Sequence, residues 1–373
     1  MVDDSADESI AADSVTAVQT AARWLLEAEA LLVGSGAGMG VDAGLGTFRG
    51  THAGVWPPLE RHGLDYADVC QPRWFEEDPA FAWAFWGHCD RLYTQTQTHG
   101  GYDLVKQWAD QVKHKAGAFC LTTNIDGHWR KAGWPERALL EKHGSCRLLQ
   151  CSKPCSDEAW PPADGDVPPL AEECDDRAEE ARLPLCPRCG AIARPNVLMF
   201  GDSQFAVGQH QLQLARYKDW LQGMRSKSKF QRRSLKGAAR RDAPERSRGP
   251  LSGLVCVEIG AGVAVATVRR EFERLCGFEG ARLIRVNPEH TSLPKALACS
   301  GKAVCVPLGA HEALRAIDAV LCKLRDGDKL PLRVRASTAS TMAGAEEADF
   351  GRLSSAEDDF FEPDVATSKQ HCK

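Results

Sequence analysis

Four cysteines give the strongest chemical signal in the sequence. Cys151 and Cys155 are separated by three residues, Cys186 and Cys189 by two, and 30 residues lie between the pairs. Two close thiol pairs suit a tetrahedral Zn²⁺, and four thiolates leave no open coordination position, so the ion would be structural rather than catalytic. A set of unrelated thiols is less well supported, because the surrounding segment has too little apolar content to fold unaided. Two more cysteines of this segment are spare candidates: Cys146 and Cys174.

A second group of polar residues follows an apolar run, in the string "LTTNIDG". Thr123, Asn124 and Asp126 would lie in the loop after a strand, and open α/β sheets bind ligands at the carboxyl ends of their strands. Asn and Asp are also common in simple turns, where their side chains bond to the backbone. Taken alone, this string favours the turn.

His143 stands in "LLEKHGS", after another short apolar run and just before the cysteine-rich segment. An imidazole, with an ordinary pKa of about 6.5, can accept a proton at neutral pH and act as a general base. A lone histidine is more often a structural residue than a catalyst. The position beside the predicted metal module favours a chemical role.

Two glycine-rich turns could approach a phosphate or a ribose. The first, "GSGAGMG", contains Gly36, Ala37 and Gly38, but it has neither the G-x-G-x-x-G spacing of a dehydrogenase nor a P-loop lysine. The second, "EIGAGV", places Gly260 and Gly262 between an apolar run and a predicted helix, where backbone N–H groups can bind an anion. A plain tight turn explains the second string nearly as well.

The elements that must position these residues alternate along the chain. Near-continuous apolar runs rich in β-branched residues predict buried strands, and helical periodicity predicts helices at 14–30, 265–276 and 311–324. Such alternation is typical of a doubly wound parallel sheet, a Rossmann-like α/β fold covered on both faces. The predicted strands are 30–33, 118–123, 254–259, 281–287 and 303–308.

The same pass along the chain predicts a domain organisation. The Rossmann-like domain would comprise residues 14–145 and 195–330, with a helical cap at about 50–100 and the zinc-binding module at 146–194 between its halves. Three segments are expected to be disordered because they are polar: 1–13, a basic insertion at about 223–250, and 331–373. The insertion carries ten basic residues against two acidic ones.

Composition excludes several classes of protein. The net charge of −5 gives no chain-wide attraction to nucleic acid or anionic lipid, which leaves only the basic insertion as a possible nucleic-acid contact. No apolar run reaches the roughly 20 residues of a membrane span, and the acidic start lacks a signal or transit sequence. Fifteen cysteines diluted over 373 residues are expected to be reduced thiols. A cytoplasmic or nuclear protein without membrane contact is the expectation.

The order of these motifs resembles the sirtuin family of NAD-dependent protein deacylases. The resemblance extends from about residue 14 to 324 apart from the basic insertion, and it is most similar to the branch with the strings "GAGMGVD" and "RPNVLMFGD". It implies NAD as cofactor, a structural Zn²⁺ and an acylated-lysine protein or peptide as substrate. The implied products are free lysine, nicotinamide and O-acyl-ADP-ribose.

The resemblance also implies roles for individual residues. His143 would be the general base, with Asn124 beside it at the reacting ribose. The cofactor would contact both glycine turns, the segment at Phe48 and Arg49 that closes over it, and the loops after two of the strands. These contacts are Gly36, Ala37, Gly38, Phe48, Arg49, Thr123, Asn124, Asp126, Gly260, Gly262 and Asn287. The acyl-lysine side chain would occupy an apolar tunnel lined by Phe48, Leu198 and Phe200. The backbone of the peptide would pair as a strand with residues 196–202, which include the predicted substrate residue Gly201.

Several positions depart from the family pattern. Thr123 stands where glutamine is usual, Gly40 and Ala43 stand where serines are usual, and Gly46 stands where proline is usual. The later Gly-Thr-Ser is replaced by glycine, alanine and glycine at 260–262. Each lost hydrogen bond would weaken NAD contacts by about 0.5–1.5 kcal/mol. Two alternatives therefore stay open: an NAD hydrolase or ADP-ribosyltransferase, and a non-catalytic NAD or ADP-ribose sensor.

Overall fold

A single parallel sheet forms the centre of the molecule. The structure, a computed structural model, describes residues 4–47, 56–153, 155–172, 174–235 and 249–327. Its six-stranded sheet has the order β3-β2-β1-β6-β7-β8, and every neighbouring pair is parallel. The strands are β1 (Ala30–Ser35), β2 (Ala118–Thr122), β3 (Leu139–Glu141), β6 (Leu254–Ile259), β7 (Arg282–Val286) and β8 (Ala303–Val306). Strand order reverses between β1 and β6, so the ligand site of such a sheet is expected where these two strands end.

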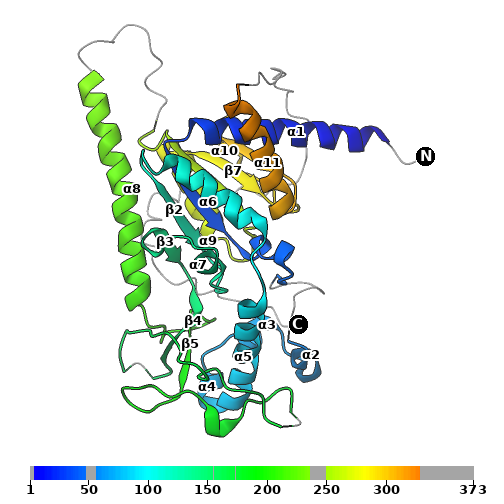
Figure 1. Ribbon diagram of the computed structural model, residues 1–373, viewed down its shortest axis with the longest axis vertical. Helices are drawn as coiled ribbons and strands as arrows, with labels where there is room; N and C mark the ends of the chain where they lie inside the picture. The colour runs from blue at the N-terminus through cyan, green and yellow to red at the C-terminus, as the bar shows by residue number, and fades with distance from the viewer. Residues whose placement is uncertain (1–3, 48–55, 154, 173, 236–248, 328–373) are drawn as a thin grey trace.

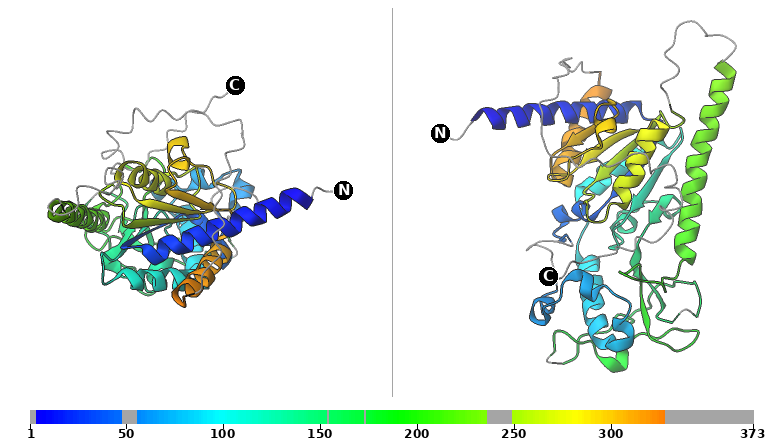
Figure 2. Two further views of the ribbon diagram at one scale, coloured as in Figure 1. Left: turned by 90° about the horizontal axis from the view of Figure 1, so that it is seen from above. Right: turned by 180° about the vertical axis from the view of Figure 1, so that it is seen from behind.

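Helices cover both faces of this sheet, which explains why its strands read as continuous apolar runs. All six residues of β1 and of β6 are buried. One face packs against α1 (Asp4–Glu27), α6 (Gly100–Val112) and α11 (Ala310–Arg325), and the other against α8 (Gly208–Leu235), α9 (Thr267–Glu279) and α10 (Lys295–Ala298). Figures 1 and 2 show α8 running along one side of the molecule and α1 crossing the end of the sheet that lies away from α4 and α5. The prediction of a doubly wound Rossmann-like sheet is confirmed.

A second, smaller part lies at the end of the molecule away from α1 (Figure 1). It contains the cap helices α2 (Pro58–His62), α3 (Tyr66–Val69), α4 (Trp74–Glu77) and α5 (Pro79–Gln95), and the antiparallel pair β4 (Gly144–Cys151) and β5 (Ala193–Val197). Aromatic side chains of the cap, such as Trp83 and Phe85, form a third apolar core against both strands. The segment predicted to be a helical cap is therefore helical and packs on the cysteine module.

The structure differs from the sequence prediction at two helix ends. The first helix begins at Asp4 rather than at Ser14, so residues 4–13 are helical instead of a disordered tail. Helix α8 continues through Leu235, so the predicted disorder from residue 223 is wrong for residues 223–235. After Gly223 this stretch has no glycine or proline and consists mostly of good helix formers, which sustain a helix without much apolar content. Residues 1–3, 236–248 and 331–373 of the predicted disorder lie outside the described residues, whereas residues 249 and 250 are described.

None of the helices that the structure describes is both long enough and apolar enough to cross a membrane.

Candidate active site and metal centre

The two glycine turns meet at the carboxyl ends of β1 and β6. The N–H of Gly36 donates to the carbonyl of Ile259 at 3.1 Å, and the N–H of Gly38 donates to the carbonyl of Gly260 at 3.0 Å. A Cβ on Gly36 or Gly38 would lie 2.7 Å from backbone atoms of Gly260, and Gly260 itself has a φ of +61°. Glycine is therefore required here because two backbones touch. Ala37 lies between them, in the 3₁₀ turn η1 (Ala37–Met39).

Asn124 joins the first glycine turn to the loop after β2. Its side-chain Nδ2 donates to the carbonyl of Gly36 at 2.9 Å, while its own N–H donates to Oγ1 of Thr122 at 3.0 Å. The remaining amide oxygen, Oδ1, is buried and has no hydrogen-bond partner among the residues that the structure describes. An unpaired buried acceptor costs about 1–3 kcal/mol, so a ligand hydroxyl that donates to it would recover that free energy. This arrangement fits the predicted contact with a ribose.

The hydroxyl groups beneath this loop belong to a network that the sequence did not indicate. Ser35 shares a 2.7 Å hydrogen bond with Thr122 and accepts one from Nε1 of Trp129 at 2.8 Å. Oγ1 of Thr123 donates to the carbonyl of Ser35 at 3.3 Å. Thr123 thus ties β2 to β1 with its hydroxyl. Its predicted role toward the cofactor stays a prediction.

Asp126 lies in the same buried loop, close to helix α7 (His128–Lys131). Its Oδ1 accepts a hydrogen bond from the backbone N–H of His128 at 2.8 Å, so the carboxyl caps the first turn of this short helix. Burial raises the pKa of Asp126, although the neighbouring His128 opposes the shift.

His143 lies between β3 and β4, at the same edge of the sheet, and its side chain is half-buried. The preceding residue, Lys142, is fixed to the end of β2 by a 2.8 Å bond from its N–H to the carbonyl of Thr122. The next residue, Gly144, has a φ of +75°, and a Cβ there would lie 2.0 Å from the carbonyl oxygen of Asn196. Glycine is needed for the turn into β4. The structure therefore brings His143 and the loop of Asn124 to the edge where the glycine turns lie.

The predicted substrate segment follows β5 and lies against His143. Leu198 donates its N–H to the carbonyl of His143 at 3.0 Å, and Phe200 donates its N–H to the carbonyl of Cys70 at 3.0 Å. Both side chains are half-buried, and Gly201 is exposed with a φ of +68°. The segment thus lies between the predicted general base and the cap helices.

A buried ion pair closes this segment into a loop, and sequence reasoning missed it. Arg194 and Asp202 approach to 2.8 Å, and both side chains are fully buried. The carboxylate also accepts a 2.9 Å hydrogen bond from the N–H of Gln204. Since Arg194 and Asp202 begin and end the string "RPNVLMFGD", their opposite charges at the two ends of an apolar run were the available signal.

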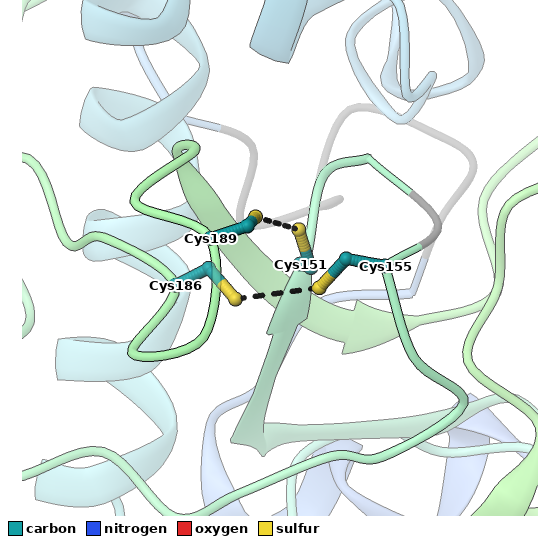
Figure 3. A group of neighbouring side chains, drawn as sticks. All are labelled: Cys151, Cys155, Cys186 and Cys189. Carbon is teal, nitrogen blue, oxygen red and sulfur yellow. Dashed lines mark hydrogen bonds between the residues drawn. The ribbon is translucent and has the colours of Figure 1, made fainter.

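The four predicted metal ligands come together at the far end of the small part. The sulfurs of Cys151, Cys155, Cys186 and Cys189 all lie within 4.8 Å of one another, with two pairs at 3.5 and 3.6 Å (Figure 3). A tetrahedral zinc with bonds of about 2.3 Å holds its sulfurs roughly 3.8 Å apart, so this donor set fits Zn²⁺. The spare candidates lie elsewhere: Cys146 is in the apolar core of the cap and Cys174 donates to Asp176.

The backbone around the second thiol pair forms a knuckle. Gly190, with a φ of +73°, donates its N–H to the carbonyl of Cys186 at 2.9 Å. Burial raises the pKa of the Cys186 thiol, but hydrogen bonds from the N–H groups of Cys189 and Arg188 and from neighbouring thiols more than offset this, and the pKa lies at about 7. A thiol with such a pKa is readily converted to the thiolate that binds metal.

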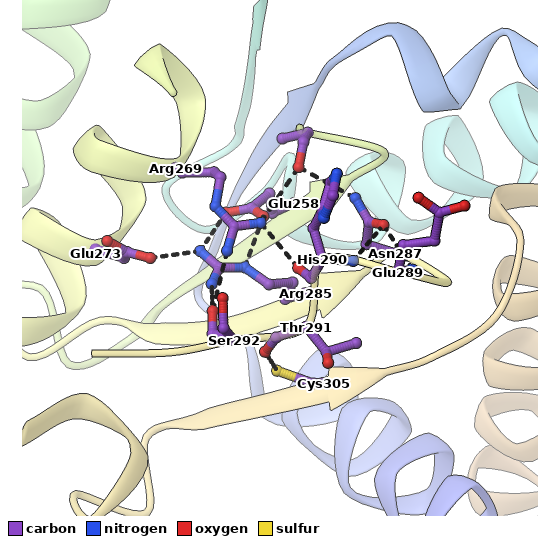
Figure 4. A network of polar contacts seen from close by, with 11 residues as sticks. Glu258, Arg269, Glu273, Arg285, Asn287, Glu289, His290, Thr291, Ser292 and Cys305 are labelled. Carbon is purple, nitrogen blue, oxygen red and sulfur yellow. Dashed lines mark hydrogen bonds and ion pairs between the residues drawn. The ribbon is translucent and has the colours of Figure 1, made fainter. Parts of the chain in front are cut away.

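The turn at Gly260 is supported from below by Asn287, which follows β7. Its Nδ2 donates to the carbonyl of Ala261 at 3.1 Å, and its Oδ1 accepts from the N–H groups of Glu289 and His290 at 3.1 and 2.9 Å (Figure 4). Both polar atoms of the amide are therefore used within the protein. The structure places Asn287 as a brace of the turn, and its predicted contact with the cofactor stays a prediction.

A cluster of buried charges lies under the same turn (Figure 4). Glu258 and Arg285 are fully buried and approach to 2.7 Å, and Arg285 also contacts Glu273 at 2.8 Å. Arg269 donates to the carbonyls of His290 and Ser292 at 2.8 and 2.9 Å. Burial raises the pKa of Glu258, and the two arginines oppose that shift. Sequence reasoning missed this cluster, although single charges inside the predicted strands 254–259 and 281–287 were its signal.

Three predicted cofactor contacts remain: Phe48, Arg49 and Gly262. Phe48 and Arg49 lie outside the described residues. Gly262 follows the supported turn, and no heavy atom of the described residues lies within 4 Å of the position that a Cβ would take. A substitution there therefore meets no steric barrier from this part of the chain.

Comparison with known proteins gives a consistent result. The sequence profile of the Sir2 family matches residues 36–216. An NAD-dependent protein deacylase 2 of Pseudomonas aeruginosa is 30% identical over 190 residues, which cover 51% of this chain and 68% of that protein. An NAD-dependent protein deacylase of Aeropyrum pernix is 28% identical over 186 residues, covering 50% of this chain and 65% of the relative. The alignments thus span about two thirds of each relative.

Solved structures extend the likeness in fold over more of the chain. A crystal structure of a Sir2 homologue in complex with NAD superposes with a TM-score of 0.52 at 18% sequence identity, covering 82% of this chain and 93% of that one. A Sir2 homologue bound to ADP-ribose gives a TM-score of 0.51 at 17% identity. At this level of identity the superposition demonstrates a shared fold.

Proposed function

Because the chain belongs to the Sir2 family, we propose that it is an NAD-dependent protein-lysine deacylase. The reaction would consume NAD and one water: the nicotinamide–ribose bond and the lysine amide bond break, the acyl group passes to the ADP-ribose part, and the products are free lysine, nicotinamide and O-acyl-ADP-ribose. The observation that carries this proposal is the position of His143 at the sheet edge where the buried, unpaired Oδ1 of Asn124 and the paired glycine turns also lie. A base, an acceptor for ribose and a close-approach turn are the groups that the reaction needs.

NAD supplies a ribose carbon that can accept the acyl oxygen when nicotinamide leaves. The residues of this chain would orient the ribose and remove a proton from one of its hydroxyl groups. Oδ1 of Asn124 would accept a hydrogen bond from a ribose hydroxyl, and the imidazole of His143 would accept the proton of a ribose hydroxyl as general base. Asp126 would hold the amide group of nicotinamide, whose N–H groups can donate to a carboxylate oxygen.

The acylated peptide would reach His143 along the segment after β5. Leu198 and Phe200 are half-buried beside the cap, and they would line the channel for the acyl-lysine side chain. The N–H groups of these two residues already bond to His143 and Cys70. A peptide that adds as a strand would therefore pair with the remaining backbone groups of residues 196–202.

The test is nicotinamide release with and without an acetylated or longer-acylated peptide, followed together with the peptide mass. We expect peptide-dependent release with loss of the acyl group. We also expect His143→Ala to reduce turnover at least 100-fold without unfolding the protein, the usual scale for removal of a general base. Exposed His114→Ala is the matched control and should retain full activity.

Each contrary result points to one of the two alternatives. Nicotinamide release that needs no peptide would replace the proposal with an NAD hydrolase. Measurable NAD binding without any release would replace it with a sensor.

A further inference from the structure

The antiparallel pair of β4 and β5 has an apolar face and a polar face, and both are buried. Leu149 and Val197 belong to the apolar core of the cap. Gln150 pairs directly with Arg194, and Arg194 and Asn196 alternate along β5, so these three side chains share the other face. None of the three is more than 2% exposed. Buried polar side chains need hydrogen-bond partners, so the segment that covers this face must supply them.

The covering segment is the backbone of residues 202–206, directly after the predicted substrate segment. Oε1 of Gln150 accepts the N–H of Ala206 at 3.0 Å, and Nε2 of the same amide donates to the carbonyl of Gln204 at 2.8 Å. Nδ2 of Asn196 donates to the carbonyl of Ala206 at 3.1 Å and to Oε1 of Gln150 at 2.9 Å. A glutamine side chain therefore pairs with this backbone as a neighbouring strand would.

The ion pair of Arg194 and Asp202 extends these contacts back to the substrate segment. The carboxylate accepts a 2.9 Å hydrogen bond from the N–H of Gln204, so both backbone groups of that residue are held by side chains. Arg194 donates to the carbonyl of Val197 at 3.3 Å, and the N–H of Met199 donates to the carboxylate at 3.4 Å. The backbone is thus fixed both where the substrate segment begins and where it ends.

These contacts lie between the metal position and the predicted general base. Gln150 directly precedes the metal ligand Cys151 at the end of β4. At the other end, the substrate segment bonds to the carbonyl of His143 through the N–H of Leu198 at 3.0 Å. The place of the substrate segment beside His143 therefore depends on buried hydrogen bonds that start next to the thiol module.

We propose that Gln150 and the pair of Arg194 and Asp202 are positioning residues that hold the backbone of residues 198–201 ready for the acylated peptide. They would set the affinity for the peptide and not that for the dinucleotide, because the glycine turns are held by β6 and Asn124 instead. A strand that is already ordered loses less conformational freedom when a peptide adds to it. The peptide half of the proposal rests on the proposed function, and the backbone half rests on the hydrogen bonds alone.

Gln150→Met tests the glutamine, because it keeps an unbranched side chain of similar length and removes every hydrogen bond of the amide. We expect the affinity for a fluorescent acetyl-lysine peptide to fall about three- to tenfold, the scale of one or two lost hydrogen bonds. The affinity for ADP-ribose should not change. In turnover, KM for the peptide should rise by a similar factor with little change in kcat.

Tyr217→Phe is the matched control for the loss of a buried hydrogen bond. Its hydroxyl is buried in the large core and donates to Glu271 at 2.7 Å. This variant should lower the melting temperature, as Gln150→Met does, and leave both affinities at the wild-type values. A fall in peptide affinity of equal size in both variants would show that lost stability, rather than positioning, explains the effect.

The charge pair is tested as the double variant Arg194→Met with Asp202→Leu, since removal of one partner would leave a buried charge alone. The double variant should be more stable than Arg194→Met, yet its peptide affinity should be lowered about three- to tenfold because the N–H of Gln204 has lost its acceptor. Wild-type peptide affinity in the double variant would contradict the role of the pair.

Hydrogen exchange tests the backbone half without any ligand. The amide of Ala206 should exchange several-fold faster in Gln150→Met, whereas the amide of Gly36, which bonds to Ile259, should not change. Unchanged exchange at Ala206 would overturn the backbone half, and unchanged peptide affinity in Gln150→Met would overturn the positioning role. Faster exchange at Ala206 in a protein whose wild type binds no acyl peptide would support the backbone half and refute the proposed function.

Discussion

Two regions that support the site, the thiol module beside His143 and the turn at Gly260, are stabilised in different ways. The segment beside His143 is held from the far end of β4 and β5 by four thiols around a metal position, in a module with little apolar content. The turn at Gly260 is held by Asn287 and Arg269, which both donate to the carbonyl of Ala261, beside the buried pair of Glu258 and Arg285. The module shares the apolar core of the cap helices, and the metal position joins the loops that have little apolar content of their own. The turn at Gly260 lies on the large core, where buried paired charges can fix backbone carbonyls.

Loss of the metal should have the largest effect on stability, because the loops that the four thiols join have little apolar content of their own. Cys186→Ser is expected to destabilise the small part by more than about 4 kcal/mol and to release zinc, whereas exposed Cys299→Ser should change neither. Zinc content and thermal unfolding measure both effects. A Cys186→Ser protein with one bound zinc and an unchanged melting temperature would show that these thiols do not form the metal site.

Removal of a buried charge should cause the second largest loss of stability. Arg285→Met leaves Glu258 without its main partner in the core, and such single removals cost about 3–5 kcal/mol. Urea unfolding measures the change. The double variant Glu258→Leu with Arg285→Met removes both charges and should recover much of this loss. A single variant as stable as the wild type would mean that the pair does not support the turn.

A change at the contact between the glycine turns should be smaller and more local. In Gly38→Ala the new Cβ would lie 2.7 Å from the backbone of Gly260, so the two turns must separate. We expect ADP-ribose affinity to fall about tenfold while stability changes by no more than about 2 kcal/mol. Gly262→Ala, where a Cβ meets nothing within 4 Å, is the matched control. Calorimetric titration that gives equal affinities for both variants would contradict the role of close backbone approach.

The sequence predicted the fold because strong local signals agreed with the global arrangement. The continuous apolar runs became β1, β2, β6, β7 and β8, and the spaced thiol pairs became the metal position. The end of α8 was wrong because a polar stretch rich in lysine and arginine was taken as disordered, although its intrinsic propensity supports a helix.

The supports of the site could not be predicted from the sequence because they depend on distant contacts. Arg194 and Asp202, or Gln150 and Ala206, become partners only when the chain is folded, and no periodicity marks such pairs. The individual contacts to NAD and to the peptide stay predictions, as does the cytoplasmic or nuclear location.

The most direct test of the account is the product balance of one reaction mixture that contains the protein, NAD and an acyl-lysine peptide. The account predicts equal amounts of nicotinamide, deacylated peptide and O-acyl-ADP-ribose, all lost together in His143→Ala. Nicotinamide formed while the peptide keeps its acyl group, or an undiminished yield from His143→Ala, would contradict it.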